Sequence, residues 1–209
     1  MAYTTEQERF WAGDFGADYR GRNQGDEIVS ANISLFSKIL RSAPNIHSIM
    51  ELGCNTGLNL RALHSINQKF ELSAVEINAD AAEQARNLGI ATILDGTVTI
   101  EVQANRTYDL VFTKGVLIHI APEKLEVVYR NLCALSARYI MVCEYYSPTP
   151  QSVTYRGHEN RLFKRDFAGE LIDRFGLRLI DYGFQYHRDN YFPQDDGTWF
   201  LLEKMGTVG

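Results

Sequence analysis

Apolar and polar positions along this chain follow two periods in turn. Short apolar runs, bounded by glycine or polar residues, are typical of buried strands. Five of them cover 46–52, 71–77, 90–94, 108–115 and 139–144. Segments with apolar residues at every third or fourth position are typical of amphipathic helices. These segments cover 26–43, 60–66, 79–88 and 122–135. Strands that alternate with helices predict an α/β fold.

The pattern changes after residue 146. Residues 147–163 have no clear period and mix aromatic, cationic and hydrogen-bonding side chains. Loops of this length in a compact domain are usually functional, so we predict a substrate-side loop insertion here, with a solvated surface loop as the alternative. A helix is then expected over 164–175, followed by two strands at 177–183 and 198–204 that form a terminal antiparallel pair.

The first strand runs into Met-Glu-Leu-Gly-Cys-Asn-Thr-Gly-Leu-Asn at 50–59, and a helical pattern follows. Gly53 and Gly57 allow positive φ and a close approach of the backbone to a ligand. The helix that begins there directs unpaired N–H groups toward the same place. The spacing therefore predicts a ligand-binding loop between the first strand and its helix.

Carboxylates follow at the ends of the next two strands. Glu76 lies about twenty residues beyond the loop, where dinucleotide-binding folds place the acid that binds ribose hydroxyls. Asp95-Gly96-Thr97 ends the third strand, at the edge where α/β proteins bind ligands. A plain Asp-Gly turn is the alternative interpretation of that segment.

The glycine loop differs from the nicotinamide-binding pattern at two positions. Glu51 precedes it, and Asn55 stands where a middle glycine is usual. A carboxylate repels a pyrophosphate and suits a ligand with a cationic centre. Over about residues 45–145 the chain resembles the class I S-adenosylmethionine (SAM) methyltransferases. The resemblance implies a Rossmann-like seven-stranded, mostly parallel sheet of order 3-2-1-4-5-7-6, with an antiparallel last strand and helices on both faces.

The resemblance also implies SAM as the cofactor, S-adenosylhomocysteine as its product, and a set of roles. Glu51 would lie near the amino end of the cofactor, Glu76 at the ribose and Asp95 near the adenine, while the end of the fourth strand would face the reacting centre. The expected cofactor-binding residues are Tyr19, Arg22, Glu51, Gly53, Asn55, Thr56, Gly57, Glu76, Ile77, Asp95, Gly96, Thr97, Thr113, Lys114, Gly115 and His119.

Three residues are candidates for the chemistry itself: His119, Lys114 and Tyr145. An imidazole can accept a proton near neutral pH, so His119 is a candidate base. A wall of the cofactor pocket and a hydrogen-bonded core histidine are its alternative roles. The end of the fourth predicted strand and the residues after it, 113–120, lack the Asn/Asp-Pro-Pro-aromatic motif that many methyltransferases of bases or exocyclic amines carry. We expect no metal.

The acceptor is expected to contact polar and aromatic side chains beyond the fifth strand. The candidates are Tyr145, Tyr155, Arg156, His158, Arg161 and Lys164. Residues 1–23 are rich in aromatic side chains and predict either an arm packed on the domain or a lid. In the second case Tyr19 and Arg22 would reach the ligand.

Composition and charge narrow the partners. The 209 residues fit one domain over 1–209, with 45% hydrophobic and 22% charged residues. A net charge of −5 argues against nucleic acid as the main partner. Three cysteines far apart indicate reduced thiols and a cytoplasmic protein, and no apolar run approaches the length of a membrane span. A monomer or a homodimer is expected.

A narrower resemblance rests on Glu8 to Gly16, Arg22-Asn23, the glycine loop and 112–120, which are similar to methylases associated with pseudaminic acid biosynthesis. It implies methyl transfer to a small polar metabolite such as a sugar or nonulosonate-type acceptor. Three alternatives remain: a non-catalytic SAM-binding regulatory module, a tRNA or other nucleic-acid methyltransferase, and a nicotinamide-dependent oxidoreductase.

Overall fold

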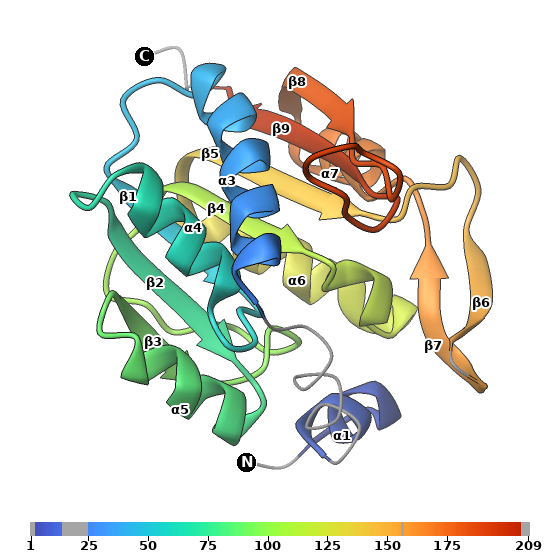
Figure 1. The fold of residues 1–209 in the computed structure, drawn as a ribbon. Helices are drawn as coiled ribbons and strands as arrows, with labels where there is room; N and C mark the ends of the chain where they lie inside the picture. The colour runs from blue at the N-terminus through green and yellow to red at the C-terminus, as the bar shows by residue number, and fades with distance from the viewer. Residues whose placement is uncertain (1–2, 14–24, 156, 206–209) are drawn as a thin grey trace.

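A computed structural model of the chain describes residues 3–13, 25–155 and 157–205, as a sheet layered between helices (Figure 1). The strands are β1 Ser48–Leu52, β2 Glu71–Glu76, β3 Ala91–Asp95, β4 Tyr108–Lys114, β5 Ser136–Glu144, β6 Gln151–Tyr155, β7 His158–Lys164, β8 Leu177–Phe184 and β9 Thr198–Lys204. The helices are α1 Glu6–Ala12, α3 Asp26–Arg41, α4 Leu58–Ile66, α5 Ala79–Asn87, α6 Leu125–Leu135 and α7 Phe167–Phe175. Two short 3₁₀ turns are η1 Leu117–His119 and η2 Pro122–Lys124.

Seven strands form one sheet in the order β3-β2-β1-β4-β5-β9-β8. The pairs among β3, β2, β1, β4 and β5 are parallel, whereas β9 is antiparallel to both of its neighbours. The predicted order 3-2-1-4-5-7-6 is confirmed, since β8 and β9 are the sixth and seventh strands of this sheet. The carboxyl ends of β1, β2, β3 and β4 therefore meet at one edge, where the candidate site lies.

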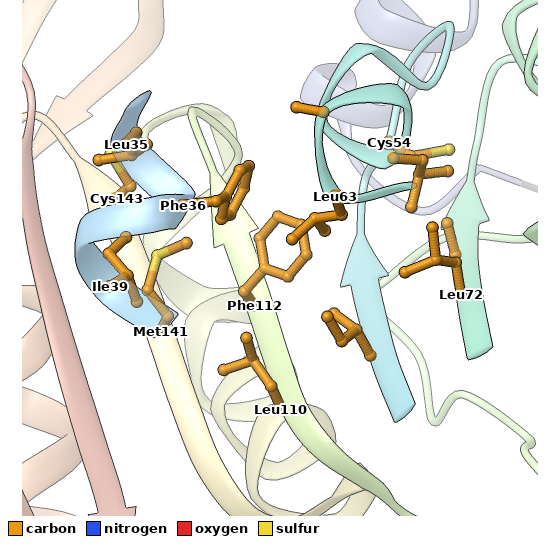
Figure 2. Close-up of a cluster of buried hydrophobic side chains, with 14 of the residues drawn as sticks. Leu35, Phe36, Ile39, Cys54, Leu63, Leu72, Leu110, Phe112, Met141 and Cys143 are labelled. Atoms are coloured by element: carbon orange, nitrogen blue, oxygen red, sulfur yellow. The ribbon is translucent and has the colours of Figure 1, made fainter. Parts of the chain in front are cut away.

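Apolar layers on the two faces of the sheet hold the helices in place. On one face, residues of α3, α4 and α5 pack against the sheet, and Figure 2 shows Phe36 of α3 beside Phe112 of β4, with ring centroids 5.3 Å apart. On the other face, α6 and α7 pack against residues such as Met50 and Val111. Because β1 is buried along its whole length, its carboxyl end is fixed in position.

Residues 147–163 are not the irregular loop that the sequence predicted. Most of them form an antiparallel hairpin, in which β6 pairs with β7 outside the main sheet (Figure 1). Leu162 and Phe163 near the end of β7 are buried, so that end of the hairpin packs on the domain. The alternation of small polar residues with Val153 and Tyr155 fits a half-exposed strand, and it was too short to stand out.

Two helix boundaries also differ from the prediction. Lys164 ends β7, and α7 starts only at Phe167 because the Asp166 side chain caps it by accepting from the Gly169 N–H. The first turn of the segment that begins at Pro122 is 3₁₀ rather than α-helical.

The N-terminal segment contains a helix that the sequence analysis did not predict. Thr5 caps α1, and the Glu8 side chain accepts in return from the Thr5 N–H, which is a complete capping box. Tyr19 and Arg22 lie outside the described residues, so the proposed lid contacts of these two are not tested. None of the described helices is long and apolar enough to cross a bilayer.

Candidate functional site

A cavity of about 230 Å³ lies at the carboxyl edge of the parallel strands. The turns that follow β1, β2, β3 and β4 supply most of its wall, and α1, α3 and the first turn of α4 supply the remainder. The cavity is lined by these predicted cofactor residues: Gly53, Asn55, Thr56, Glu76, Ile77, Gly96, Thr97, Lys114, Gly115 and His119. The strand order thus brings together residues that are up to 66 positions apart, from 53 to 119.

The loop after β1 requires its glycines. Gly53 has φ +85°, and a Cβ there would lie 2.8 Å from the Val116 side chain. Gly57 has φ +83° at the start of α4, and its Cβ would lie 2.8 Å from the Leu88 side chain. Asn55 adopts φ +49° between them, which asparagine tolerates better than most residues. Gly57 shapes the loop from behind and does not itself line the cavity.

Glu76 joins this loop to the next one. One carboxylate oxygen accepts from the Asn55 N–H at 2.7 Å, and the other accepts from the Asn78 N–H at 2.8 Å. The side chain is 7% exposed and lines the cavity. A carboxylate oxygen has more than one lone pair, so Glu76 retains the capacity to accept from ligand hydroxyls.

Glu51 is fully buried behind the loop. Its Oε1 accepts from Asn59 Nδ2 at 2.6 Å, and its Oε2 has no hydrogen-bond partner among the described residues. Burial raises the pKa of Glu51 to about 8, although the hydrogen bond from Asn59 and the charge of Lys114 oppose the rise. The side chain lies outside the cavity lining, whereas Asn59 is part of it.

The end of β3 is built differently from the prediction. Asp95 forms an ion pair with Arg86 at 2.6 Å on the surface and does not line the cavity, so its expected contact with adenine has no support in the geometry. The carboxylate beside Thr97 is that of Glu8, which accepts from the hydroxyl groups of Thr97 and Thr99. Burial opposes ionisation of Glu8, but these and other hydrogen bonds prevail and lower its pKa to about 2.

Glu8 comes from α1, far away in the sequence, and the sequence analysis gave it no role in the site. The pattern Thr-x-x-Glu at 5–8 is the usual signature of a capping box and could have located the helix. Nothing in the local sequence links Glu8 to Thr97, because only the tertiary fold brings them together.

Glu144, at the end of β5, orders the turn after β4. It accepts from the backbone N–H groups of Val116 at 3.1 Å and Ile118 at 3.4 Å. Burial raises the pKa of Glu144 to about 7, while these N–H groups lower it. The turn carries Val116 against Gly53 and leads to His119, so Glu144 supports two parts of the wall. Thr113, which was predicted to bind cofactor, is fully buried and does not line the cavity.

His119 forms part of the cavity wall. Its Nδ1 lies 2.7 Å from the Arg161 carbonyl oxygen, so Nδ1 carries the hydrogen and Nε2 is an acceptor. The rings of Trp11 and Tyr155 flank it, with centroids 4.4 and 5.1 Å away. Burial lowers the pKa of His119 to about 4, which leaves the imidazole neutral and weakly basic. This geometry favours the wall interpretation over the general-base interpretation.

The predicted substrate residues do not gather in the cavity. The Tyr145 hydroxyl donates to Asp195 at 3.0 Å, and Lys164 lies 5.4 Å from the centre of the Tyr145 ring. Arg161 pairs with Glu6 of α1 at 3.1 Å, and none of these side chains lines the cavity. Tyr155 contacts His119 from outside the lining. Arg156 and the side chain of His158 lie outside what the structure describes.

Comparisons with known proteins locate this arrangement among known folds. Neither family models nor curated protein sequences match the chain. Among solved structures, the magnesium protoporphyrin IX methyltransferase of Synechocystis PCC 6803 with bound SAM superposes with a TM-score of 0.69 at 13% identity, over 98% of this chain and 100% of the other. The chain has the fold of the class I SAM-dependent methyltransferases.

Two further structures share this methyltransferase fold. A SAM-dependent methyltransferase of Leishmania major gives a TM-score of 0.70 at 16% identity, over 94% of this chain and 81% of the other. The SAM-bound aminopentose methyltransferase from Micromonospora echinaspora, involved in calicheamicin biosynthesis, gives 0.64 at 12% identity, over 98% and 99%. At these identities the likeness concerns the fold. Within the described residues, no three His, Cys, Asp or Glu side chains are grouped as metal ligands.

Proposed function

We propose that this chain is a SAM-dependent methyltransferase that acts on a small polar acceptor. The observation that carries the proposal is Glu51, a buried carboxylate behind a glycine loop with one oxygen left without a partner among the described residues. A buried acceptor of this kind calls for a donor from a ligand, and a carboxylate favours a cationic one. A nicotinamide dinucleotide, which brings a pyrophosphate to this loop, fits the site less well.

The cavity residues fit the parts of SAM in turn. The loop from Gly53 to Thr56 would hold the amino-acid portion, with Glu51 at its amino end. Glu76 would accept from the ribose hydroxyls, and the turn at Gly96 and Thr97 would border the adenine. SAM supplies a methyl group on a sulfonium, which is already activated for transfer.

The task of the chain is then to align the acceptor and to exclude water. Trp11 and His119 close one side of the cavity, and the contact of their rings leaves little room for solvent there. Because His119 has a pKa of about 4, it is a poor base for an alcohol. The site therefore favours an acceptor whose reacting atom needs no strong base, such as a neutral amine or an ionised oxygen.

The class of acceptor is proposed from the cavity and the fold together. Lys114 is the one lysine or arginine among the lining residues that the structure describes, and it suits an acceptor with an anionic group. A solved relative in fold acts on an aminopentose, as its name states. We therefore propose a sugar-like acceptor, which includes the nonulosonates that the sequence resemblance implies, and a cytoplasmic enzyme, either monomeric or dimeric.

A SAM-binding module without catalysis is the second candidate. The low pKa of His119 favours it, because no strong base then faces the cavity. A nucleic-acid substrate is disfavoured by the net charge of −5. Methylation of an acceptor in repeated turnovers would distinguish an enzyme from a non-catalytic SAM-binding module.

The proposal is tested by calorimetric titration of the protein with SAM, S-adenosylhomocysteine and NAD. Glu76→Gln should weaken SAM binding about tenfold or more, because an amide provides one acceptor fewer and directs N–H groups at the N–H groups of Asn55 and Asn78. Asp95→Asn is the matched control, since that side chain is exposed and outside the cavity, and it should bind SAM as the wild type does. Binding of NAD without either adenosyl ligand would overturn the proposal.

A further inference from the structure

Asn32 of α3 is a buried polar residue that the proposed roles do not use. It is 1% exposed, it is one of the residues that line the cavity, and its amide oxygen has no hydrogen-bond partner among the described residues. Buried polar atoms in proteins are nearly always paired, so an orphaned amide oxygen beside a cavity points to a missing donor.

Asn32 lies on the side of α3 that faces the core, at the point where the helix reaches the cavity. Ile28 lies one turn earlier on the same side of α3, and both residues line the cavity. One turn later, Phe36 is fully buried among apolar side chains. Asn32 thus interrupts an apolar stripe at the place where the helix leaves the core and reaches the cavity.

A second orphaned acceptor belongs to the neighbouring elements. α3 packs against α4, where Asn59 also lines the cavity and donates to Glu51. The other oxygen of Glu51 has no partner among the described residues. When Glu51 is ionised, both unsatisfied atoms are acceptors, and both belong to residues of β1 and α3, beside α4.

We propose that Asn32 binds, together with Glu51, the primary ammonium group at the amino-acid end of the ligand. An ammonium carries three donors and no acceptor, which matches a pair of acceptors without donors. The amide of Asn32 can present its oxygen to the cavity by rotation of the terminal group. The inference rests on the proposed function, because SAM is the ligand that brings an ammonium to this part of the site.

The charged groups around Glu51 make the binding pH-dependent. Lys114 of β4 favours its ionised form, Glu76 of β2 disfavours it, and burial keeps much of it protonated at neutral pH. A bound ammonium adds a positive charge beside Glu51, so the carboxyl group gives up its proton to solvent on binding. SAM binding near neutral pH should therefore release protons.

The test is calorimetric titration of wild type and Asn32→Leu with two ligands, SAM and methylthioadenosine, which has the adenosyl part and no amino-acid part. Leucine is close to asparagine in size and suits the apolar stripe, so the variant should melt at the same temperature or higher. We expect SAM to bind it about 10- to 100-fold more weakly, as for loss of a hydrogen bond to a charged group, and methylthioadenosine to bind unchanged.

Three results would overturn the assignment: unchanged SAM affinity in Asn32→Leu, equal weakening of both ligands, or a variant with a clearly lower melting temperature. Titration in two buffers of different ionisation enthalpy adds a second readout. Wild type should release protons on binding SAM, and Glu51→Gln should not; equal proton release by both would contradict the role of Glu51. If wild type binds neither ligand, the proposed function itself fails.

Discussion

At the scale of single residues, the site contains two carboxylates whose environments shift their pKa values in opposite directions. Glu51 is buried with one hydrogen bond and has a pKa of about 8, whereas Glu8 accepts several hydrogen bonds and has a pKa of about 2. Above its ordinary pKa, burial of Glu51 lowers the stability of the folded state, whereas the hydrogen bonds to ionised Glu8 raise that stability. The difference, together with the unpartnered oxygen of Glu51, supports the proposal that Glu51 and not Glu8 binds the charged end of the ligand.

Glu51 should make the folded state less stable as the pH rises. Its pKa is 4.5 when unfolded and about 8 when folded, so the folded state holds the extra proton and loses stability between about pH 4.5 and about pH 8. Glu51→Gln removes this penalty and should raise the free energy of unfolding by about 1–3 kcal/mol at the upper end of that range, with little change at the lower end. Urea denaturation of wild type and Glu51→Gln at several pH values measures the free energy of unfolding.

Glu83→Gln is the control for this prediction, because Glu83 is exposed on α5 and should not alter the pH profile. Glu144 contributes a fall of the same sign up to about pH 7, so some slope remains in the Glu51 variant. A Glu51→Gln profile that runs parallel to that of wild type would contradict the buried, protonated carboxyl group.

The sequence identified the residues whose roles depend on local spacing. Gly53 and Glu76 lie in strand-to-turn patterns that any open α/β fold uses, and both line the cavity. Glu8 and Asn32 could not be found in this way, because each reaches the cavity from a helix that precedes the first strand. Their chemistry depends on partners that only the tertiary fold provides.

At the scale of elements, α1 belongs to the site although it lies apart from the sheet (Figure 1). Gln7 donates to the Asn160 carbonyl of β7 at 3.1 Å, and Glu8 accepts from Thr97 and Thr99 beyond β3. The carbonyl oxygen of Trp11 accepts from Asn78 Nδ2 at 3.2 Å. A single short helix thus connects the hairpin with the turns after β2 and β3.

Thr99→Val should loosen α1 without unfolding the domain. The substitution keeps the shape of the side chain but removes a hydroxyl group that donates to Glu8, so α1 should detach more often. We expect hydrogen exchange of the amides of residues 6–12 to become about 5- to 10-fold faster, a change that corresponds to about 1 kcal/mol. Mass spectrometry of the exchanged peptides measures the rates.

Thr92→Val on β3 is the matched control, since Thr92 is exposed and makes no contact with α1 in the described hydrogen bonds. Equal exchange rates for wild type and Thr99→Val would contradict the prediction, because the other contacts of α1 would then be sufficient to hold it in place. The sequence predicted neither α1 nor the β6–β7 hairpin, because seven- and five-residue elements contain too few periods to be recognised.

At the scale of the whole molecule, β9 completes the sheet. It lies between β5 and β8, and its Leu201 and Leu202 are fully buried on opposite faces of the sheet. The strand order could be predicted from the sequence because the alternating strands and helices and the glycine loop resemble those of the methyltransferases. The position of the β6–β7 hairpin outside the sheet could not be predicted from the sequence, since its residues have no distinct hydrophobic pattern.

A chain that ends at Gly197 should therefore lose cooperative folding. Without β9, two central apolar layers are exposed and β8 has no partner in the sheet. Thermal unfolding followed by circular dichroism should show no sharp transition in this shorter chain, whereas the full chain should melt in one sharp transition. A cooperative transition in the shorter chain, with SAM binding retained, would refute the prediction.

The position of β9 has a consequence for the order of assembly. β9 is the last described strand along the chain and the one that joins β8 to β5, so both neighbours keep open edges until β9 has inserted between them. A chain at that stage presents two strands to unwanted pairing with other chains. Slow insertion of β9 would therefore lengthen the interval in which the protein can aggregate.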